Sequence, residues 1–135
     1  MVFADTFYWI ALTNPEDQHC RDALRFDQLL AGGQVSISEE VLLEVLTFFA
    51  GDTWLRSRAV ETVRAIMTDP GVRIIPQTHQ TFLAGFELYA ARLEKGYSLI
   101  DCISMETIRR EGILAVLTND RHFEQEGFRA LFREP

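Results

Sequence analysis

Short apolar runs alternate with longer segments in which apolar residues recur at the spacing of a helix. Runs of three to five apolar residues bounded by turn residues are typical of buried strands. The alternation predicts an α/β fold with a parallel sheet of about five strands, covered by helices on both faces. The predicted strands are Val2–Asp5, Val35–Ile37, Val72–Ile75, Ile113–Leu117 and an amphipathic edge strand, Phe128–Phe132.

Capping residues and glycines mark the predicted helices between these strands. Seven helices are expected, and their approximate bounds are 6–12, 14–31, 38–51, 53–67, 78–95, 98–112 and 121–126. The second begins at Asn14-Pro15, with Asn as the cap and Pro at the first helical position. The chain of 135 residues contains no linker or repeat, so we expect residues 1–135 to form a single domain.

Composition and charge narrow the class of protein. The net charge is −7, which argues against non-specific binding to nucleic acid through overall charge but leaves nucleic acid open as a substrate. No apolar run is long enough to span a membrane, and no secretory signal is recognisable at the N-terminus. Cys20 and Cys102 form no paired motif, so we interpret them as reduced thiols of a cytoplasmic protein.

Asp5 is the single charged residue in the first thirteen positions, MVFADTFYWIALT. A carboxylate in such an apolar run is expected to be buried, and an unpaired buried charge costs several kcal/mol. Asp5 therefore needs a cation, a set of N–H donors or a metal. A salt bridge in the core is the plainer interpretation, although no basic residue lies nearby in sequence.

Three further acids are candidates for the same site, and each could instead have a purely structural role. Asp120 follows the strand Ile113–Leu117 and could simply cap a turn. Asp101 completes the pattern Ser98-x-x-Asp101, a capping box, at a helix start that we expect to be buried. Glu44 shares a polar stripe with Glu40, and a solvated helix face would explain both.

The ordered set of four acids is more specific than any one of them. In open α/β sheets ligands bind beyond the carboxyl ends of the strands, where Asp5 and Asp120 are expected. Four clustered carboxylates could not all remain ionised without counter-charge, and oxygen ligands suit Mg²⁺ or Mn²⁺. Two such ions could activate a water and stabilise the leaving oxygen in phosphodiester hydrolysis.

The order and spacing of four short motifs carry a resemblance that spans the whole chain. They are Ala4-Asp5-Thr6, the helix segment Ser38–Glu44, Tyr97-Ser98-Leu99-Ile100-Asp101, and Leu117-Thr118-Asn119-Asp120-Arg121-His122-Phe123 with Gly127-Phe128 after it. With these motifs the chain resembles the PIN domain family, in particular the VapC-type toxin ribonucleases of toxin–antitoxin pairs. The resemblance implies a three-layer PIN-like fold and carries the family's acidic quartet over to Asp5, Glu44, Asp101 and Asp120, as both metal ligands and catalytic residues.

The same resemblance implies Mg²⁺- or Mn²⁺-dependent cleavage of RNA, a homodimer and a small antitoxin partner. Four other residues are candidates for contacts to the substrate or to the metal ligands, although each also fits a structural role: Thr6, Ser104, Thr118 and His122. The motifs do not indicate which RNA is cut.

Two other classes of function remain open at this point. A Mg²⁺-dependent phosphatase also places an Asp after its first strand, but the haloacid-dehalogenase type needs a second Asp where this chain has Phe7. A receiver domain needs a Lys after a late strand, and the one Lys of the chain is Lys95, at a predicted helix end. A PIN-like scaffold that binds RNA or protein without cutting is the other alternative.

Overall fold

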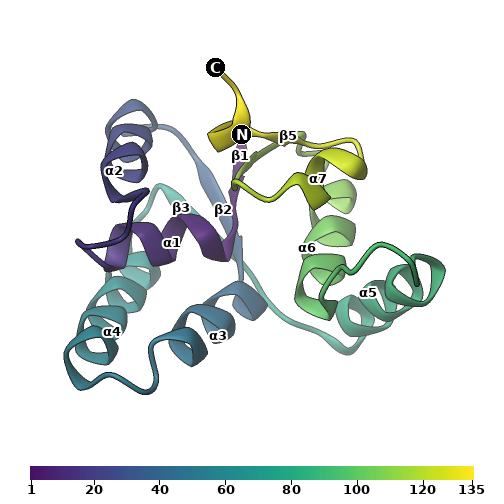
Figure 1. Ribbon diagram of the computed structural model, residues 1–135, viewed down its shortest axis with the longest axis horizontal. Helices are drawn as coiled ribbons and strands as arrows, with labels where there is room; N and C mark the ends of the chain where they lie inside the picture. Colours follow the sequence, from purple (N-terminus) through teal and green to yellow (C-terminus); the bar gives the residue numbers. More distant parts are fainter.

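A parallel sheet of five strands, in the order β3-β2-β1-β4-β5, lies at the centre of the computed structural model, which describes residues 1–135 (Figure 1). The expected α/β fold is therefore confirmed, together with its helical layers on both faces. The strands are β1 (Val2–Ala4), β2 (Val35–Ser38), β3 (Val72–Ile75), β4 (Ala115–Leu117) and β5 (Arg129–Ala130).

Helices α1, α2 and α4 lie on one side of the sheet and α5, α6 and α7 on the other, while α3 contacts both α1 and α6 (Figure 1). No helix combines the length and the apolar composition that crossing a membrane requires. The helices are α1 (Thr6–Thr13), α2 (Cys20–Leu29), α3 (Glu39–Phe48), α4 (Thr53–Thr68), α5 (His79–Ala91), α6 (Leu99–Arg110), α7 (Arg121–Gln125) and the 3₁₀ turn η1 (Leu131–Arg133).

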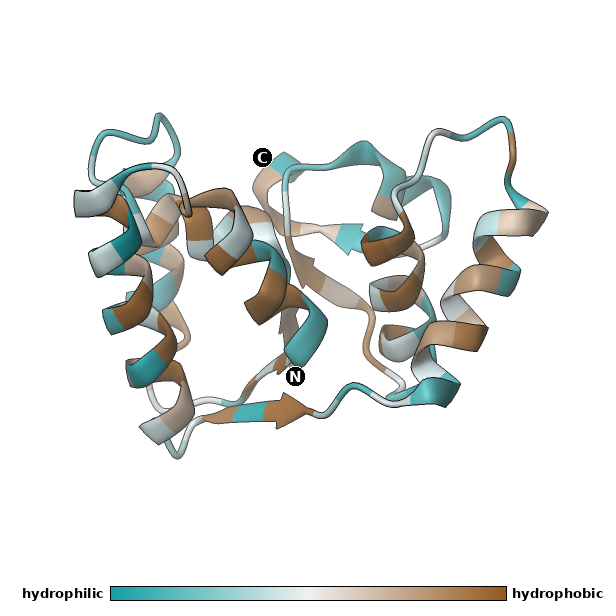
Figure 2. Cartoon of the chain, turned by 90° about the horizontal axis from the view of Figure 1, so that it is seen from below, coloured by the Kyte–Doolittle hydropathy of each residue, from teal (hydrophilic) through white to brown (hydrophobic).

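The core forms where the apolar strands meet the apolar faces of the helices (Figure 2). Phe3, Ile37 and Val116, from three neighbouring strands, are fully buried. Helix α5 packs tightly on α6 because Gly85 has no side chain. A Cβ at Gly85 would lie 2.9 Å from the Cα of Ile103, closer than carbon atoms approach without displacement of one helix.

Local capping signals are good predictors of where several helices begin. The Ser38 hydroxyl accepts a hydrogen bond from the amide of Val41 at 3.3 Å and caps α3. At the start of α6, Ser98 and Asp101 form the predicted capping box. These caps satisfy amides that have no partner within the helix.

Several predicted elements are shorter than expected. The second helix begins at Cys20 rather than after Asn14, because Asn14 and Asp17 accept hydrogen bonds from the amides of Glu16 and His19 and hold residues 14–19 in turns. The long helix α5 ends at Ala91, before Lys95. The last strand, expected over 128–132, has two residues and then turns into η1.

The register of the sheet brings the candidate acids to one edge. Strand β1 lies between β2 and β4, and its last residue, Ala4, pairs with Leu117, the last residue of β4. Asp5 and Thr118 directly follow this pair, so they leave the sheet side by side. The chain continues from β1 towards one side of the sheet and from β4 towards the other, which is where open α/β sheets form a ligand crevice.

Candidate metal centre

Asp5 is buried at the carboxyl end of β1 and has no cationic partner. The residue is 6% exposed, and none of the ion pairs in the structure includes it. Its Oδ2 accepts a hydrogen bond from the Thr118 hydroxyl at 3.0 Å. The alternative of a core salt bridge is thus wrong, and the need for a counter-charge remains.

Asp101 occupies the third position of α6 and points one carboxylate oxygen back to the helix start. Its Oδ2 accepts a hydrogen bond from the Ser98 amide at 3.2 Å, while the Ser98 hydroxyl accepts one from the Asp101 amide at 3.0 Å. Asp101 is half-buried rather than buried as expected, because the first turn of α6 lies at the rim of the molecule's core. The Oδ1 atom accepts no hydrogen bond from the protein and is free for a ligand.

Glu44 reaches the same region from α3. The Thr6 hydroxyl, one residue after Asp5, donates a hydrogen bond to Oε1 of Glu44. Glu40, which the sequence groups with Glu44 on a solvated face, is instead buried and accepts a hydrogen bond from Thr81 on α5 at 2.9 Å. The two acids therefore have different surroundings, and Glu44 alone faces Asp5.

Asp120 lies at the N-cap of α7, just beyond β4. Its Oδ1 accepts a hydrogen bond from the amide of His122 at 2.9 Å, so the expected capping role is present. The Asp120 amide donates to the Thr118 hydroxyl at 3.1 Å, which links it through that hydroxyl to Asp5. Ligand atoms of Asp101, Asp120 and His122 lie within 4.8 Å of one another.

The pKa values of two of these carboxyl groups show how closely the set is gathered. Burial, together with the nearby charges of Asp101 and Glu44, raises the pKa of Asp5 to about 7, against the opposing effect of hydrogen bonds from the protein. The pKa of Asp101 is also raised, first by burial and then by the charges of Asp120 and Glu44. Four carboxylates gathered without a lysine or arginine beside them form a donor set that fits a hard divalent cation.

The other predicted residues differ in how they meet this cluster. Thr6 and Thr118 each donate a hydrogen bond to one of the four acids. The imidazole of His122 lies beside Asp120. Ser104 is fully buried one turn beyond Asp101, and its hydroxyl contacts no hydrogen-bond partner, so the structure does not join it to the carboxylates.

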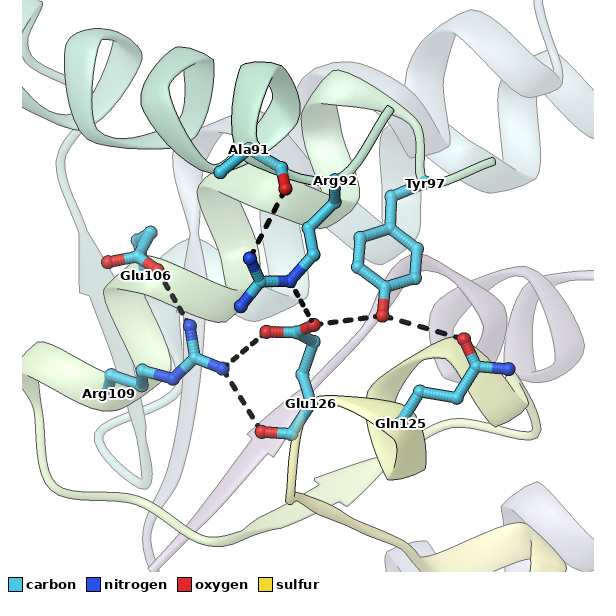
Figure 3. A network of polar contacts seen from close by, with 7 residues as sticks. All are labelled: Ala91, Arg92, Tyr97, Glu106, Arg109, Gln125 and Glu126. Atoms are coloured by element: carbon cyan, nitrogen blue, oxygen red, sulfur yellow. Dashed lines mark hydrogen bonds and ion pairs between the residues drawn. The ribbon is translucent and has the colours of Figure 1, made fainter. Parts of the chain in front are cut away.

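A network around Glu126, which no motif in the sequence indicates, fastens α7 to α6 (Figure 3). The Glu126 carboxylate accepts hydrogen bonds from Arg92 at 2.9 Å, from Arg109 at 2.7 Å and from the Tyr97 hydroxyl at 3.0 Å. Burial alone would raise the pKa of Glu126, but these three donors outweigh it and hold the pKa at about 2. No sequence pattern pairs residues 92, 97 and 109 with 126.

The network matters for the site because the two helices carry two of the acids. Glu126 directly follows α7, whose N-cap is Asp120, and Arg109 lies on α6, which begins beside Asp101. Tyr97 precedes the cap of α6, and its ring lies against the His122 ring with 5.0 Å between centroids. Glu126 therefore ties the far ends of both helices together and limits how far Asp101 and Asp120 can separate.

We expect Glu126→Gln to lower the free energy of unfolding by roughly 2–4 kcal/mol at pH 7, because two guanidinium groups lose their buried counter-charge. Equilibrium urea unfolding measures the change. Glu134→Gln is the matched control, since Glu134 pairs with Arg129 where both side chains are well exposed, and exposed ion pairs contribute little to stability. Equal losses for the two variants would contradict the central role of Glu126.

Thr118→Val removes one hydroxyl and with it two hydrogen bonds, one to each of Asp5 and Asp120. We expect a loss of roughly 1–3 kcal/mol in stability and about tenfold weaker binding of Mn²⁺, because residues that orient metal ligands tune their affinity. Calorimetric titration with Mn²⁺ and urea unfolding give the two numbers.

Thr13→Val is the control for this substitution. Thr13 is as deeply buried, and its hydroxyl bonds to Thr62 at 3.0 Å, at the end of α1 away from the acids. Thr13→Val is expected to lower stability and leave Mn²⁺ affinity unchanged. An equal loss of affinity in both variants would show that Thr118 acts through general stability alone.

This arrangement of acids beyond a five-stranded parallel sheet is accompanied by a direct family match. Residues 2–128 match the model of the PIN domain, and the chain belongs to the PIN domain family. A comparison with curated proteins finds no match.

Among solved structures, the chain is similar to VapC toxins and their complexes. It shares 28% identity with Mycobacterium tuberculosis VapC20, described as a sarcin–ricin loop cleaving toxin, over 95% of this chain and 96% of that one, with a TM-score of 0.83.

Two further likenesses concern the fold alone. Rickettsia felis VapBC2, bound to a DNA fragment from its promoter, is 16% identical over 96% and 97% of the two chains, with a TM-score of 0.70. DNA-bound VapBC from Salmonella typhimurium is 20% identical over 96% and 95%, with a TM-score of 0.66.

Proposed function

We propose that this PIN-domain protein is a Mg²⁺- or Mn²⁺-dependent endoribonuclease and the toxin of a VapBC-type toxin–antitoxin pair. The observation that carries the proposal is the gathering of Asp5, Glu44, Asp101 and Asp120 at one edge of the sheet with no lysine or arginine to neutralise them. These four residues would hold divalent cations, which would supply the missing positive charge and the water activation and leaving-group stabilisation that phosphodiester hydrolysis needs.

Some residues of this site are proposed to bind the cations, and others are proposed to orient these metal ligands. Asp5, Glu44, Asp101 and Asp120 are the proposed ligands and catalytic residues. Thr6 and Thr118 fix the carboxylate oxygens of Glu44 and Asp5 by donating to them, which leaves the opposite oxygens of these groups for ligands. His122 is the proposed contact at the rim of the site, whereas the buried Ser104 has no contact to the acids that would support a role there.

RNA is the proposed substrate because of the likeness to VapC20, which is described as cleaving the sarcin–ricin loop. A negatively charged protein needs its cations to bring a phosphate backbone to this edge. Since the carboxylates repel phosphate in their absence, binding and cleavage of RNA are both expected to require the metal.

The proposed partners follow from the same relatives. A small antitoxin protein is proposed because two of the similar structures are VapBC complexes, and a homodimer is proposed with it. Exposed aromatic residues on α5, Phe82, Phe86 and Tyr89, are each close to half exposed and are suited to a protein contact. Light scattering of the purified chain measures whether it forms the proposed dimer.

We place the protein in the cytoplasm, in keeping with two unpaired cysteines.

Cleavage of a single-stranded RNA pool and of a sarcin–ricin loop hairpin by purified protein tests the proposal. Reactions contain Mn²⁺, Mg²⁺ or EDTA, and the products are resolved by length. Cutting with either metal and none with EDTA is the expected result.

Intact RNA in every reaction, from folded protein free of antitoxin, would overturn the nuclease and favour a PIN scaffold that binds without cutting. The phosphatase alternative loses its support, because the family is the PIN domain.

A further inference from the structure

His122 has a ring nitrogen whose bonding capacity nothing in the protein uses. Its Nδ1 is shielded from solvent and has no hydrogen-bond partner. Oδ1 of Asp120 lies 3.4 Å away, close enough for an ion pair with a protonated ring, but the two atoms form no hydrogen bond. Buried polar atoms without partners are uncommon in folded proteins, and a bound ion is one of the groups that can satisfy such an atom.

The position of this nitrogen matches that of a ligand on a shared cation. Metal–ligand distances near 2.1 Å place two adjacent ligand atoms about 3.0–3.5 Å apart and two opposite ones about 4.2 Å apart. The 3.4 Å between Nδ1 and Asp120 Oδ1 falls within the range for adjacent ligands. The ligand atoms of Asp101, Asp120 and His122 all lie within 4.8 Å, so small side-chain rotations would bring them onto one ion.

Two contacts hold the imidazole in this place. The His122 amide donates to Asp120 Oδ1 at 2.9 Å, which fixes the first turn of α7 on the carboxylate. The ring of Tyr97 packs on the His122 ring, and the Tyr97 hydroxyl is itself held by Glu126 at 3.0 Å. The nitrogen is therefore positioned before any ion binds, which lowers the entropic cost of binding.

We propose that His122 is a nitrogen ligand of the cation held by Asp101 and Asp120, so that this half of the site prefers Mn²⁺ over Mg²⁺. The inference rests on the proposed metal-dependent function and adds one ligand and a metal preference to it. Mg²⁺ favours oxygen ligands and keeps its waters, whereas a nitrogen ligand adds affinity for first-row transition metals, the series in which Mn²⁺ binds most weakly. Asp5 and Glu44, with oxygen atoms alone, form the half without this preference.

The test compares Mn²⁺ and Mg²⁺ binding to the full chain by isothermal titration calorimetry, without RNA. We expect His122→Ala to weaken Mn²⁺ binding at least tenfold and to change Mg²⁺ binding less than twofold. His79→Ala is the matched control, because His79 stacks on Phe82 at the start of α5, on a different helix from the acids, and it is expected to change neither.

Electron spin-echo spectroscopy of bound Mn²⁺ gives a second readout that does not depend on catalysis, and the spectrum of the wild-type protein needs no variant to fold. Modulation from an imidazole nitrogen is expected in the wild-type protein and is expected to vanish in His122→Ala. If Mn²⁺ binds without nitrogen modulation, or if His122→Ala weakens both metals equally, the ligand role of His122 is overturned while the metal centre stands. If neither metal binds the wild-type protein, the proposed function falls with it.

Discussion

Asp101→Asn is expected to abolish metal-dependent RNA cleavage and to leave the fold intact. The amide oxygen of Asn can still accept the hydrogen bond from the Ser98 amide that Asp101 accepts at 3.2 Å, so the cap of α6 is kept. The negative charge is lost at a position that Asp120 and Glu44 also crowd. Because a cation contributes several kcal/mol to catalysis, we expect a fall on the order of 10³-fold in the initial rate.

A matched substitution separates this loss from a general effect of removing an acid. Asp22→Asn changes the same chemistry on α2, where Asp22 is exposed and pairs loosely with Arg25 at 3.7 Å. The rate of Asp22→Asn should stay within twofold of the wild-type rate. Cleavage by Asp101→Asn within about tenfold of wild type would remove Asp101 from the proposed catalytic set.

The second large effect is on stability, and bound metal is expected to offset much of it. Asp5 has an ordinary pKa of 3.8 in the unfolded chain and a pKa of about 7 in the fold. Between these two values the folded protein keeps a proton that the unfolded chain releases, so stability falls as the pH rises from about 4 to about 7 and then levels. The difference corresponds to roughly 4 kcal/mol lost above pH 7 in the absence of metal.

Asp5→Asn removes this penalty because an amide has no charge to desolvate and can still accept the Thr118 hydrogen bond. In EDTA at pH 8, we expect its melting temperature to exceed that of the wild type by on the order of 10 °C. Mn²⁺ at a hundred times its dissociation constant is expected to stabilise the wild type by about 2.7 kcal/mol and the variant much less. Thermal melts at pH 5 and pH 8, with EDTA or Mn²⁺, make the comparison.

The result that would contradict this account is a wild-type melting temperature that is independent of both pH and metal. Glu126 does not obscure the comparison, since its pKa of about 2 means that its contribution is complete above about pH 4.5 and is lost only in stronger acid. The pH window from 5 to 8 therefore reports mainly on the site.

Much of the fold is predictable from local pattern. The central strands are recognisable as short apolar runs, and the caps at Ser38 and Ser98 act within three residues of their own position. The errors in the predicted bounds of two elements also have local causes. Hydrogen bonds to Asn14 and Asp17 compete with the first turns of the second helix, and a two-residue edge strand leaves too little pattern to set its length.

The candidate site, too, is predictable from the sequence only in part. Asp5 and Asp120 follow strands, so their shared edge can be inferred from topology before any coordinates exist. The burial of Glu40 against Thr81 depends on how α3 meets α5, and the pairing of Arg109 with Glu126 spans two helices. The unpartnered nitrogen of His122 likewise depends on side-chain positions that no spacing in the sequence specifies.

The central claim is that the four carboxylates form a divalent-metal centre, and anomalous diffraction from a crystal grown with Mn²⁺ tests it most directly. We expect one or two strong anomalous peaks among the side chains of Asp5, Glu44, Asp101 and Asp120, absent from a crystal of Asp101→Asn under the same conditions. No peak among these side chains at saturating Mn²⁺, or peaks confined to acids elsewhere on the surface, would contradict the account.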